Sequence, residues 1–217
     1  MKKGNRWAAL LLALACAGSL AACQEKQEDV PEEQYDAKPV VYLYPEEETQ
    51  VSVTLELDGT FTSTYPDYGD GWTVTAQPDG TLTDPETGRT YYCLFWEGII
   101  DRQFDLSAGF CVAGEDTAAF LEDALARLGL TEREANEFII YWLPRMEGNP
   151  YNLISFQTDA YTDAAELTID PAPDTLIRVF MAWKGLEQPV EIPAQELTAP
   201  ARTGFTAVEW GGAELGK

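Results

Sequence analysis

Two segments with helical spacing lie in the middle of a chain whose other apolar segments have the spacing of strands. From Val51 to Leu57 apolar and polar residues alternate, which is the period of a half-buried strand. Between residues 115 and 144 the apolar residues recur every three or four positions, and strand signals then resume. This order predicts an α+β domain, with a mainly antiparallel sheet and an inserted antiparallel helix pair on one face of it.

Apolar runs bounded by turn residues predict the strands. They lie at 40–44, 51–57, 61–65, 72–76, 90–96, 153–156, 166–169, 176–183 and 205–210. Asp58-Gly59 is a strong hairpin signal between the second and third of these strands. The segment Thr90–Trp96 is apolar on both faces, so we expect it at the centre of the sheet, followed by a loop from Glu97 to Gly114.

Two helices are predicted with a very short link between them. Glu115 or Asp116 can cap the first, and Gly129 stands where a glycine usually follows a helix end. The second opens with the capping box Thr131–Glu134 and should end at Pro144. Because the link is so short, the two helices should pack as an antiparallel hairpin.

The N-terminal segment has the features of a secretory signal. Three cations within the first six residues precede a run from Trp7 to Ala22 that is almost without polar residues. The run is short for a membrane-spanning helix, which needs about 20 apolar residues. It ends in Leu20-Ala21-Ala22-Cys23, which resembles the lipobox of bacterial lipoproteins. An ordinary signal peptide with a chance cysteine is the alternative.

The lipobox resemblance implies an arrangement in three parts. Residues 1–22 would be a signal peptide that is removed, and Cys23 would carry a lipid that holds the protein on the extracellular face of the cytoplasmic membrane. Residues 23–37 are acidic and lack apolar periodicity, so we expect a flexible tether after the lipidated cysteine. Residues 38–217 should form a single extracellular α+β domain.

Charge and residue types limit the possible functions. The net charge is −23, and loss of residues 1–22, which contain three cations and no acids, makes it about −26. Nucleic acid is not an expected partner, because its binding needs a basic surface. The chain has no histidine, which removes the usual general base and the commonest zinc ligand. We expect no cofactor and no metal.

Two cysteines remain after those of the signal and the lipid site. Outside the cytoplasm Cys93 and Cys111 are candidates for a disulfide. The alternative is that both stay reduced and pack as small apolar side chains.

Three segments resemble a known group of proteins. Lys38–Pro45 (KPVVYLYP), Tyr65–Trp72 and Tyr141–Tyr151 are similar to segments of uncharacterised secreted proteins and lipoproteins of Gram-positive anaerobes. That resemblance covers most of the chain after the tether. It implies an extracellular location and a shared fold, but no activity.

Two sets of residues are candidates for a functional site. Tyr68 and Trp72 lie in or beside a Gly/Asp-rich loop, where exposed rings could bind a glycan or a peptide; core packing is the alternative. Glu97, Asp101 and Asp105 could flank a glycosidic bond in a carboxylate-dependent hydrolase. Alternatively, one of these acids pairs with Arg178, whose apolar neighbours predict partial burial.

These observations predict a membrane-anchored extracellular lipoprotein that binds a ligand or partner without catalysis. Its partners would be the membrane, through the N-terminal lipid, and a glycan or protein ligand. A glycan hydrolase at the cell surface is the alternative function.

Overall fold

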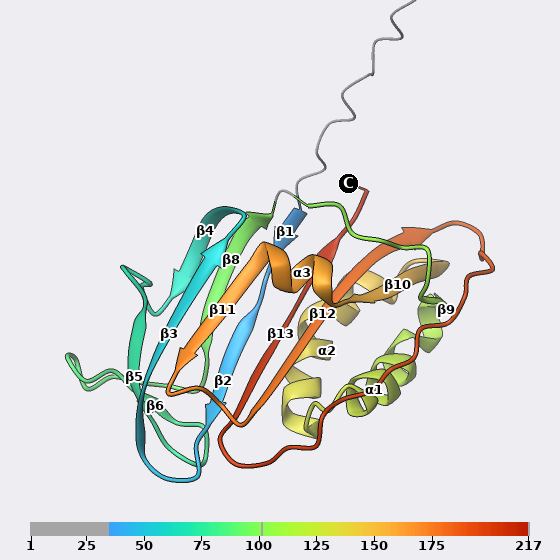
Figure 1. The fold of residues 1–217 in the computed structure, drawn as a ribbon. Coiled ribbons are helices and arrows are strands. Elements are labelled where there is room, and N and C mark those ends of the chain that lie inside the picture. Colours follow the sequence, from blue (N-terminus) through green and yellow to red (C-terminus); the bar gives the residue numbers. More distant parts are fainter. Residues whose placement is uncertain (1–34, 101, 217) are drawn as a thin grey trace, which may run out of the picture. The chain divides into compact units, whose positions relative to one another are not determined.

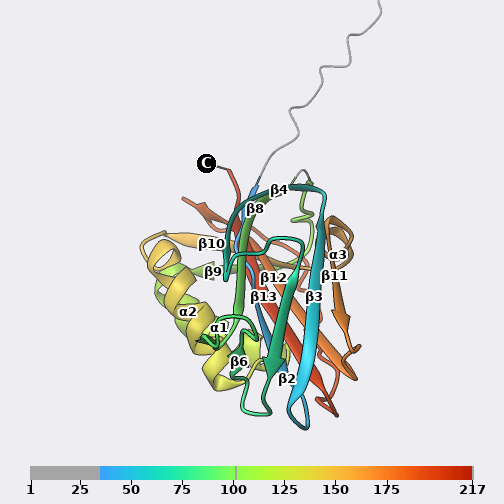
Figure 2. The ribbon, with the colours of Figure 1, turned by 90° about the vertical axis from the view of Figure 1, so that its left-hand side faces the viewer.

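The computed structural model describes residues 35–100 and 102–216. They form three layers: a smaller β-sheet, a larger β-sheet and a pair of helices. Figure 2 shows the helix pair on one side of the larger sheet and β3 and β11 of the smaller sheet on the other. Within this part of the chain no helix is long and apolar enough to cross a membrane.

The larger sheet has eight strands. They are β1 (Tyr35–Ala37), β2 (Val40–Tyr44), β4 (Gly59–Tyr65), β8 (Leu94–Ile100), β9 (Phe110–Ala113), β10 (Tyr151–Gln157), β12 (Thr175–Leu186) and β13 (Thr206–Glu214). Across the sheet the order is β4, β8, β2, β13, β12, β10, β9, and β1 pairs with β8 on the same side as β2. Only the pairing of β12 with β13 is parallel, so the sheet is mainly antiparallel (Figure 1).

The smaller sheet has five antiparallel strands. In spatial order they are β11 (Ala165–Asp170), β3 (Thr49–Leu57), β5 (Trp72–Ala76), β6 (Leu82–Thr83) and β7 (Thr90–Tyr91). The helices are α1 (Thr117–Arg127), preceded by a 3₁₀ turn at Gly114–Asp116, α2 (Glu132–Met146) and the short α3 (Asp159–Ala164).

The larger sheet separates two hydrophobic cores, and β12 shows how the sequence builds both. Phe180 and Ala182 face the smaller sheet, whereas Val179, Met181 and Trp183 face the helices. Side chains alternate between the two faces of a strand, so a strand that is covered on both sides must be apolar almost throughout. Burial of each large apolar side chain contributes about 1.5–3 kcal/mol.

The predicted α+β class is confirmed, and the helix pair covers one face of a mainly antiparallel sheet as expected. The prediction for residues 90–96 was wrong. The chain leaves the smaller sheet after Tyr91 and enters the larger one at Leu94, so that Tyr92 and Cys93 interrupt the expected strand. Glu97–Ile100, which were predicted as the start of a loop, belong to β8. The predicted central position was also wrong, because β8 is next to the edge of the larger sheet, whereas β12 and β13 lie near its centre.

Other local predictions also need correction. The Asp58-Gly59 turn joins β3 to β4, but the two strands lie in different sheets and do not form a hairpin. The short elements β9 and α3 were not predicted. The last residues of the predicted tether, Tyr35–Ala37, pair with β8, so the folded domain begins before Lys38.

The helix ends follow the sequence signals in part. Thr131 and Glu134 form the predicted capping box, in which each side chain accepts a hydrogen bond from the other residue's backbone N–H, and Gly129 has a positive φ of 87°. Asp116 makes no side-chain capping bond. Pro144 lies inside α2, where it removes one helical hydrogen bond, and the helix ends two residues later at Met146 rather than at the proline.

Candidate functional site

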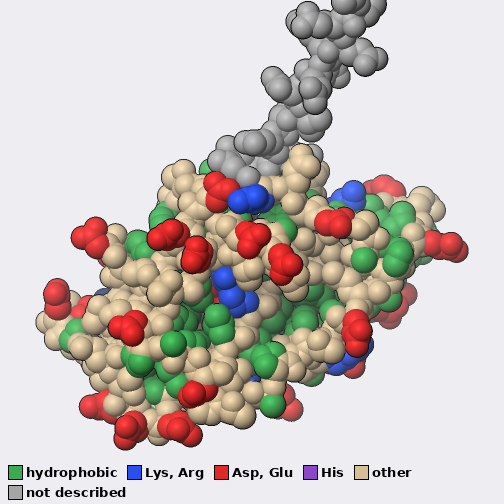
Figure 3. All heavy atoms as spheres, in the orientation of Figure 1, with side chains coloured by type: hydrophobic (Ala, Val, Ile, Leu, Met, Phe, Trp, Pro, Cys, Tyr) green, Lys and Arg blue, Asp and Glu red, His purple; other side chains and the backbone are tan. Residues whose placement is uncertain are grey.

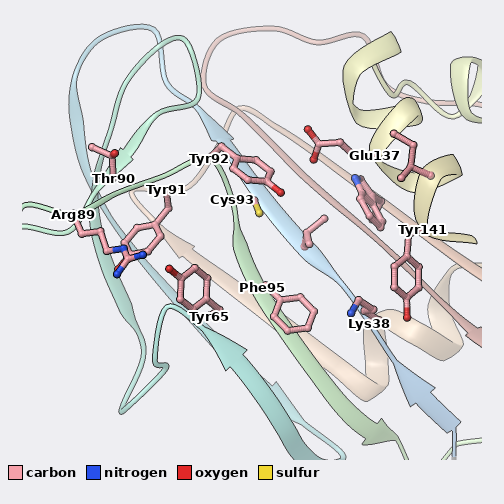
Figure 4. Close-up of a pocket in the computed structure, with 13 residues that line it drawn as sticks. Lys38, Tyr65, Arg89, Thr90, Tyr91, Tyr92, Cys93, Phe95, Glu137 and Tyr141 are labelled. Atoms are coloured by element: carbon pink, nitrogen blue, oxygen red, sulfur yellow. The ribbon is translucent and has the colours of Figure 1, made fainter.

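A groove of about 630 Å³ lies between α2 and the segment that connects the two sheets. We call it the aromatic groove. Its walls are Lys38, Val40, Tyr65, Arg89, Thr90, Tyr91, Tyr92, Cys93, Phe95, Glu137, Ile140, Tyr141 and Trp210. Figure 4 shows Arg89, Tyr65 and Tyr91 at one end, Lys38, Phe95 and Tyr141 at the other, and Tyr92 and Cys93 between them.

The groove gathers exposed apolar side chains. Five large hydrophobic residues are classed as exposed in the described part of the chain, and three of them line this groove: Tyr65 (50%), Tyr92 (54%) and Ile140 (74%). Apolar side chains scattered singly over a surface are ordinary, whereas a concave cluster marks a binding site.

At one end of the groove a lysine is held between two rings. The Nζ atom of Lys38 lies 4.7 Å from the ring centre of Phe95 and 4.5 Å from that of Tyr141. Glu97 lies 3.7 Å from the same nitrogen and also accepts a hydrogen bond from Thr62. The negative ring faces and the carboxylate therefore fix the ammonium group in place.

At the other end an arginine lies over two tyrosines. The guanidinium carbon of Arg89 is 5.9 Å from the ring centres of both Tyr65 and Tyr91. These two rings meet edge to face at 5.4 Å, so the three side chains form one stacked cluster at the mouth of the groove.

The wall formed by α2 carries Glu137, whose carboxylate already has partners. Tyr42 donates a hydrogen bond of 2.6 Å to it, and Trp210 in turn donates to the Tyr42 hydroxyl at 3.1 Å. Burial, followed by this bond, raises the pKa of Tyr42 well above its ordinary value. Arg133 lies 3.4 Å from the same carboxylate.

The thiol in the groove is not activated. Burial, together with the nearby charge of Glu137, raises the pKa of Cys93 to about 12. At neutral pH Cys93 is therefore protonated and a poor nucleophile.

The aromatic residues predicted as a ligand site pack against the core instead. Trp72 is 3% exposed and donates a hydrogen bond of 2.9 Å to the carbonyl of Pro66. The Tyr68 hydroxyl donates to the carbonyl of Leu55 and accepts from the N–H of Leu55, and its ring meets Trp72 edge to face at 4.8 Å. Tyr68 fixes the Gly/Asp-rich loop to β3, and Trp72 bonds to the start of that loop. Both also line a hollow of about 420 Å³ beside the loop, in which Tyr68 is partly buried.

The predicted acidic set does not converge. Glu97 faces the side of the larger sheet that carries the helices, because its neighbour Trp96 faces the smaller sheet. The Asp105 backbone carbonyl accepts hydrogen bonds from the side chains of Ser155 and Gln157. These side chains lie on the side of the larger sheet that faces the smaller sheet, because their neighbours Ile154 and Phe156 face the helices. Asp105 therefore lies on the opposite side of the larger sheet from Glu97. Asp101 lies outside the described residues, as does the predicted lipid site Cys23.

Arg178 is partly buried and paired with an acid, but the predicted partner was wrong. Its partner is Glu209, at 2.6 Å, rather than Glu97 or Asp105. The candidate disulfide is also absent: Cys93 and Cys111 are free thiols, and Cys111 lies on β9, at the far edge of the larger sheet from β8. No group of three or more metal-ligating side chains is present among the described residues.

Within the described part of the chain, acidic side chains do not cluster at one place in the way that the aromatic side chains of the groove do. Figure 3 shows Asp and Glu scattered over the drawn face. Of the nine Lys and Arg residues that the structure describes, four contact tyrosine or phenylalanine rings that line the groove, namely Lys38, Arg89, Arg133 and Arg145. Lys38 and Arg133 pair with Glu97 and Glu137, so four cations and two acids leave an excess of positive charge around the groove of a strongly acidic protein.

Sequence reasoning missed this groove. Tyr91, Tyr92 and Phe95 were noted only as members of a strand, and Lys38, Arg89 and Tyr141 had no predicted role. The useful signal was the unusual aromatic density of Thr90–Trp96, which exceeds what one buried strand needs.

Comparisons with known proteins identify one relative. An uncharacterized protein in the bglA 3' region of Butyrivibrio fibrisolvens is 46% identical over 66 residues, which are 29% of this chain and 67% of that protein. No family model matches the chain, and no solved structure matches it. On the strength of the shared segment, the chain belongs to the same family as the uncharacterized Butyrivibrio fibrisolvens protein.

Proposed function

We propose that the protein is a non-catalytic glycan-binding module, held at the extracellular face of the cytoplasmic membrane by a lipid on Cys23. The observation that carries the binding role is the aromatic groove, which holds three of the five exposed large hydrophobic residues of the described chain. Its volume of about 630 Å³ lies within the range of about 300–1,000 Å³ that is usual for ligand sites.

The shape and composition of the groove support a sugar ligand. Tyr65 at one end of the groove and Tyr92 between its two ends present partly exposed rings, and flat rings of this kind stack on the C–H faces of sugars. Tyrosine also offers a hydroxyl to a polar ligand while its ring stays apolar. The groove runs from Arg89, Tyr65 and Tyr91 to Lys38 and Tyr141 (Figure 4), so it can hold a short stretch of a longer chain.

The carboxylates and the thiol of the groove are paired or protonated, which supports binding without catalysis. Glu97 is paired with Lys38 and Thr62, and Glu137 with Tyr42 and Arg133. Cys93 stays protonated because burial raises its pKa. A pair of free carboxylates facing each other, which a glycosidase needs, is not found among the lining residues of the groove.

Binding can be tested on a soluble fragment from residue 24 to 217, which contains the compact unit 32–217. Its binding to a panel of glycans and wall polymers should be followed together with the release of products. Tyr92→Ala and Tyr65→Ala should each weaken binding about tenfold, because each removes a stacking ring. Leu176→Ala is the matched control, since Leu176 is exposed (39%) but does not line the groove.

Each part of the proposal has an outcome that would contradict it. Absence of binding to the whole panel, or equal binding by the two tyrosine variants, would remove the groove as a glycan site. Formation of products would remove the non-catalytic role. For the anchor, Cys23→Ala should release the protein from cells into the medium, and its retention on the membrane would refute lipidation at that cysteine.

A further inference from the structure

We propose that the aromatic groove takes an acidic glycan and that Arg89 binds a carboxylate of its sugar units. This inference rests on the proposed glycan-binding function and names the class of glycan. It is argued from the charge of the groove, from the surroundings of Arg89 and from the position of Lys38.

Arg89 lacks the acidic partner that most cations of this protein have. Six of the nine described Lys and Arg residues form ion pairs, namely Lys38, Arg102, Arg127, Arg133, Arg178 and Arg202. Arg89 forms none with any described residue, although the chain has 37 acids for 14 cations. Its guanidinium instead lies over the faces of Tyr65 and Tyr91.

Glu86 and Asp84, the acids nearest to Arg89 in the sequence, form no ion pair with it, and Asp84 is committed to another role. Asp84 accepts hydrogen bonds from the backbone N–H groups of Glu86 and Thr87, which hold the turn before Arg89. These bonds also lower the pKa of Asp84. Because Asp84 closes the turn and Glu86 forms no ion pair with Arg89, the guanidinium remains available to a ligand at the end of the groove, where it lies beside Tyr65 and Tyr91 (Figure 4).

A guanidinium in this setting suits a carboxylate. Its planar fork of N–H donors matches the two oxygens of a carboxylate, and the pair is stronger than a hydrogen bond between neutral groups. The tyrosine rings beneath it keep the guanidinium oriented without using its N–H groups. Uronic acids combine a ring with C–H faces for stacking and a carboxylate for such a pair, so one sugar unit could use both parts of the cluster.

Lys38 extends the same chemistry to the far end of the groove. Its ammonium is partly neutralised by Glu97 at 3.7 Å, yet it still lies over two lining rings. A cation at each end, with apolar rings between them, fits a chain that carries anionic groups at intervals. A cationic ligand fits poorly, because it would have to displace Lys38 and Arg89 from the ring faces that they cover.

The high negative charge of the protein does not prevent an anionic glycan from binding in the groove. At an ionic strength of about 0.15 M, charges farther apart than about 8 Å are largely screened. Distant surface carboxylates therefore contribute little, whereas a ligand carboxylate in contact with Arg89 keeps its attraction.

The test compares two ligands with the same sugar chain, one with ionised carboxylates and one with these groups neutralised as methyl esters. The full-length purified protein would be titrated calorimetrically, at about 0.15 M salt, with an oligogalacturonate and with its fully methyl-esterified form. We expect the acid to bind at least tenfold tighter than the ester. Arg89→Gln should lower the affinity for the acid far more than the affinity for the ester, and so remove most of that difference. Arg127→Gln is the control, because it removes an exposed cation that does not line the groove.

The outcomes separate the two proposals. Equal affinity for acid and ester would overturn the acidic preference but leave a glycan-binding module in place. An acid preference that survives Arg89→Gln would overturn the role of Arg89. Tighter binding of a glycerol phosphate polymer than of the uronate would overturn the choice of carboxylate. Failure of both galacturonides and of every glycan in the panel would overturn the proposed function as well.

Discussion

Arg178 and Glu209 face each other across the parallel pairing of β12 and β13, with 2.6 Å between Nε and Oε2. The side chains are 10% and 0% exposed. Trp96 of β8 donates a hydrogen bond to the other carboxylate oxygen, and Arg178 donates to the carbonyl of Ala165, at the start of β11. This ion pair therefore links three strands of the larger sheet to the smaller sheet.

Removal of the arginine should destabilise the fold strongly. Arg178→Met leaves Glu209 as a buried charge without its partner, and breaking a buried pair in this way typically costs about 3–5 kcal/mol. Urea unfolding of the 24–217 fragment would measure the loss. The double variant with Arg178→Met and Glu209→Leu should regain much of the stability, because it leaves no uncompensated charge.

An exposed ion pair provides the comparison. Arg127 and Asp123 are 51% and 73% exposed, 3.7 Å apart on one face of α1, so Arg127→Met should cost less than about 1 kcal/mol. If the Arg178 variant were no less stable than the Arg127 variant, the buried pair would have no structural importance.

Much of the fold follows from hydrophobic periodicity. The alternation from Val51 to Leu57 and the apolar run of residues 176–183 correctly predicted β3 and β12, and the capping box at Thr131 correctly predicted the start of α2. Strand pairing could not be predicted in the same way. Periodicity tells which face of a strand is buried but not which sheet the strand joins, so β4 and the segment 90–96 were misplaced.

The groove was harder to predict, because it is assembled from separate segments. Lys38 precedes β2, Tyr65 ends β4, Arg89 precedes β7 and Tyr141 lies on α2. Their meeting depends on the crossing from β7 to β8 at Tyr92, where the predicted strand is interrupted. The Gly/Asp-rich loop drew attention to Trp72 instead, but loop composition does not reveal that a ring is packed inward.

Truncation of a core aromatic residue should lower the stability of the protein much more than truncation of an aromatic residue in the groove. Trp72→Ala removes a side chain that is 3% exposed, together with its hydrogen bond to Pro66, and should cost about 3–5 kcal/mol. Tyr92→Ala, at a side chain that is 54% exposed, should change stability by less than about 0.5 kcal/mol. Thermal unfolding of both variants would measure this contrast. A fully stable Trp72 variant would contradict the packing described for that loop.

The capping box at the start of α2 should contribute measurably to stability. Thr131→Ala removes the oxygen that accepts from the Glu134 N–H, and loss of such a cap costs about 1 kcal/mol. Thr131→Ser keeps the oxygen and should be close to neutral. Urea unfolding would compare the two variants, and equal stabilities would show that the cap contributes nothing.

The thiol of Cys93 should be protected by burial rather than by oxidation. Its pKa is raised from 9.0 to about 12, so the folded protein holds roughly a thousandfold less thiolate at about pH 8 than the unfolded chain. Alkylation by iodoacetamide, followed by mass spectrometry of the peptide, should therefore be far slower in buffer than in concentrated urea, with or without a reducing agent. Fast labelling of the folded protein, or labelling that requires reduction, would contradict a buried free thiol.

The same raised pKa predicts how stability depends on pH. The unfolded thiol ionises from about pH 9, whereas the folded one keeps its proton until about pH 12. The unfolded state therefore loses a proton that the folded state retains, and the contribution of Cys93, fully present below about pH 9, falls as the pH rises through this window. Cys93→Ala should make the free energy of unfolding decline less steeply above pH 9, as urea titrations at several pH values would measure. An unchanged slope would mean that the thiol ionises equally in both states.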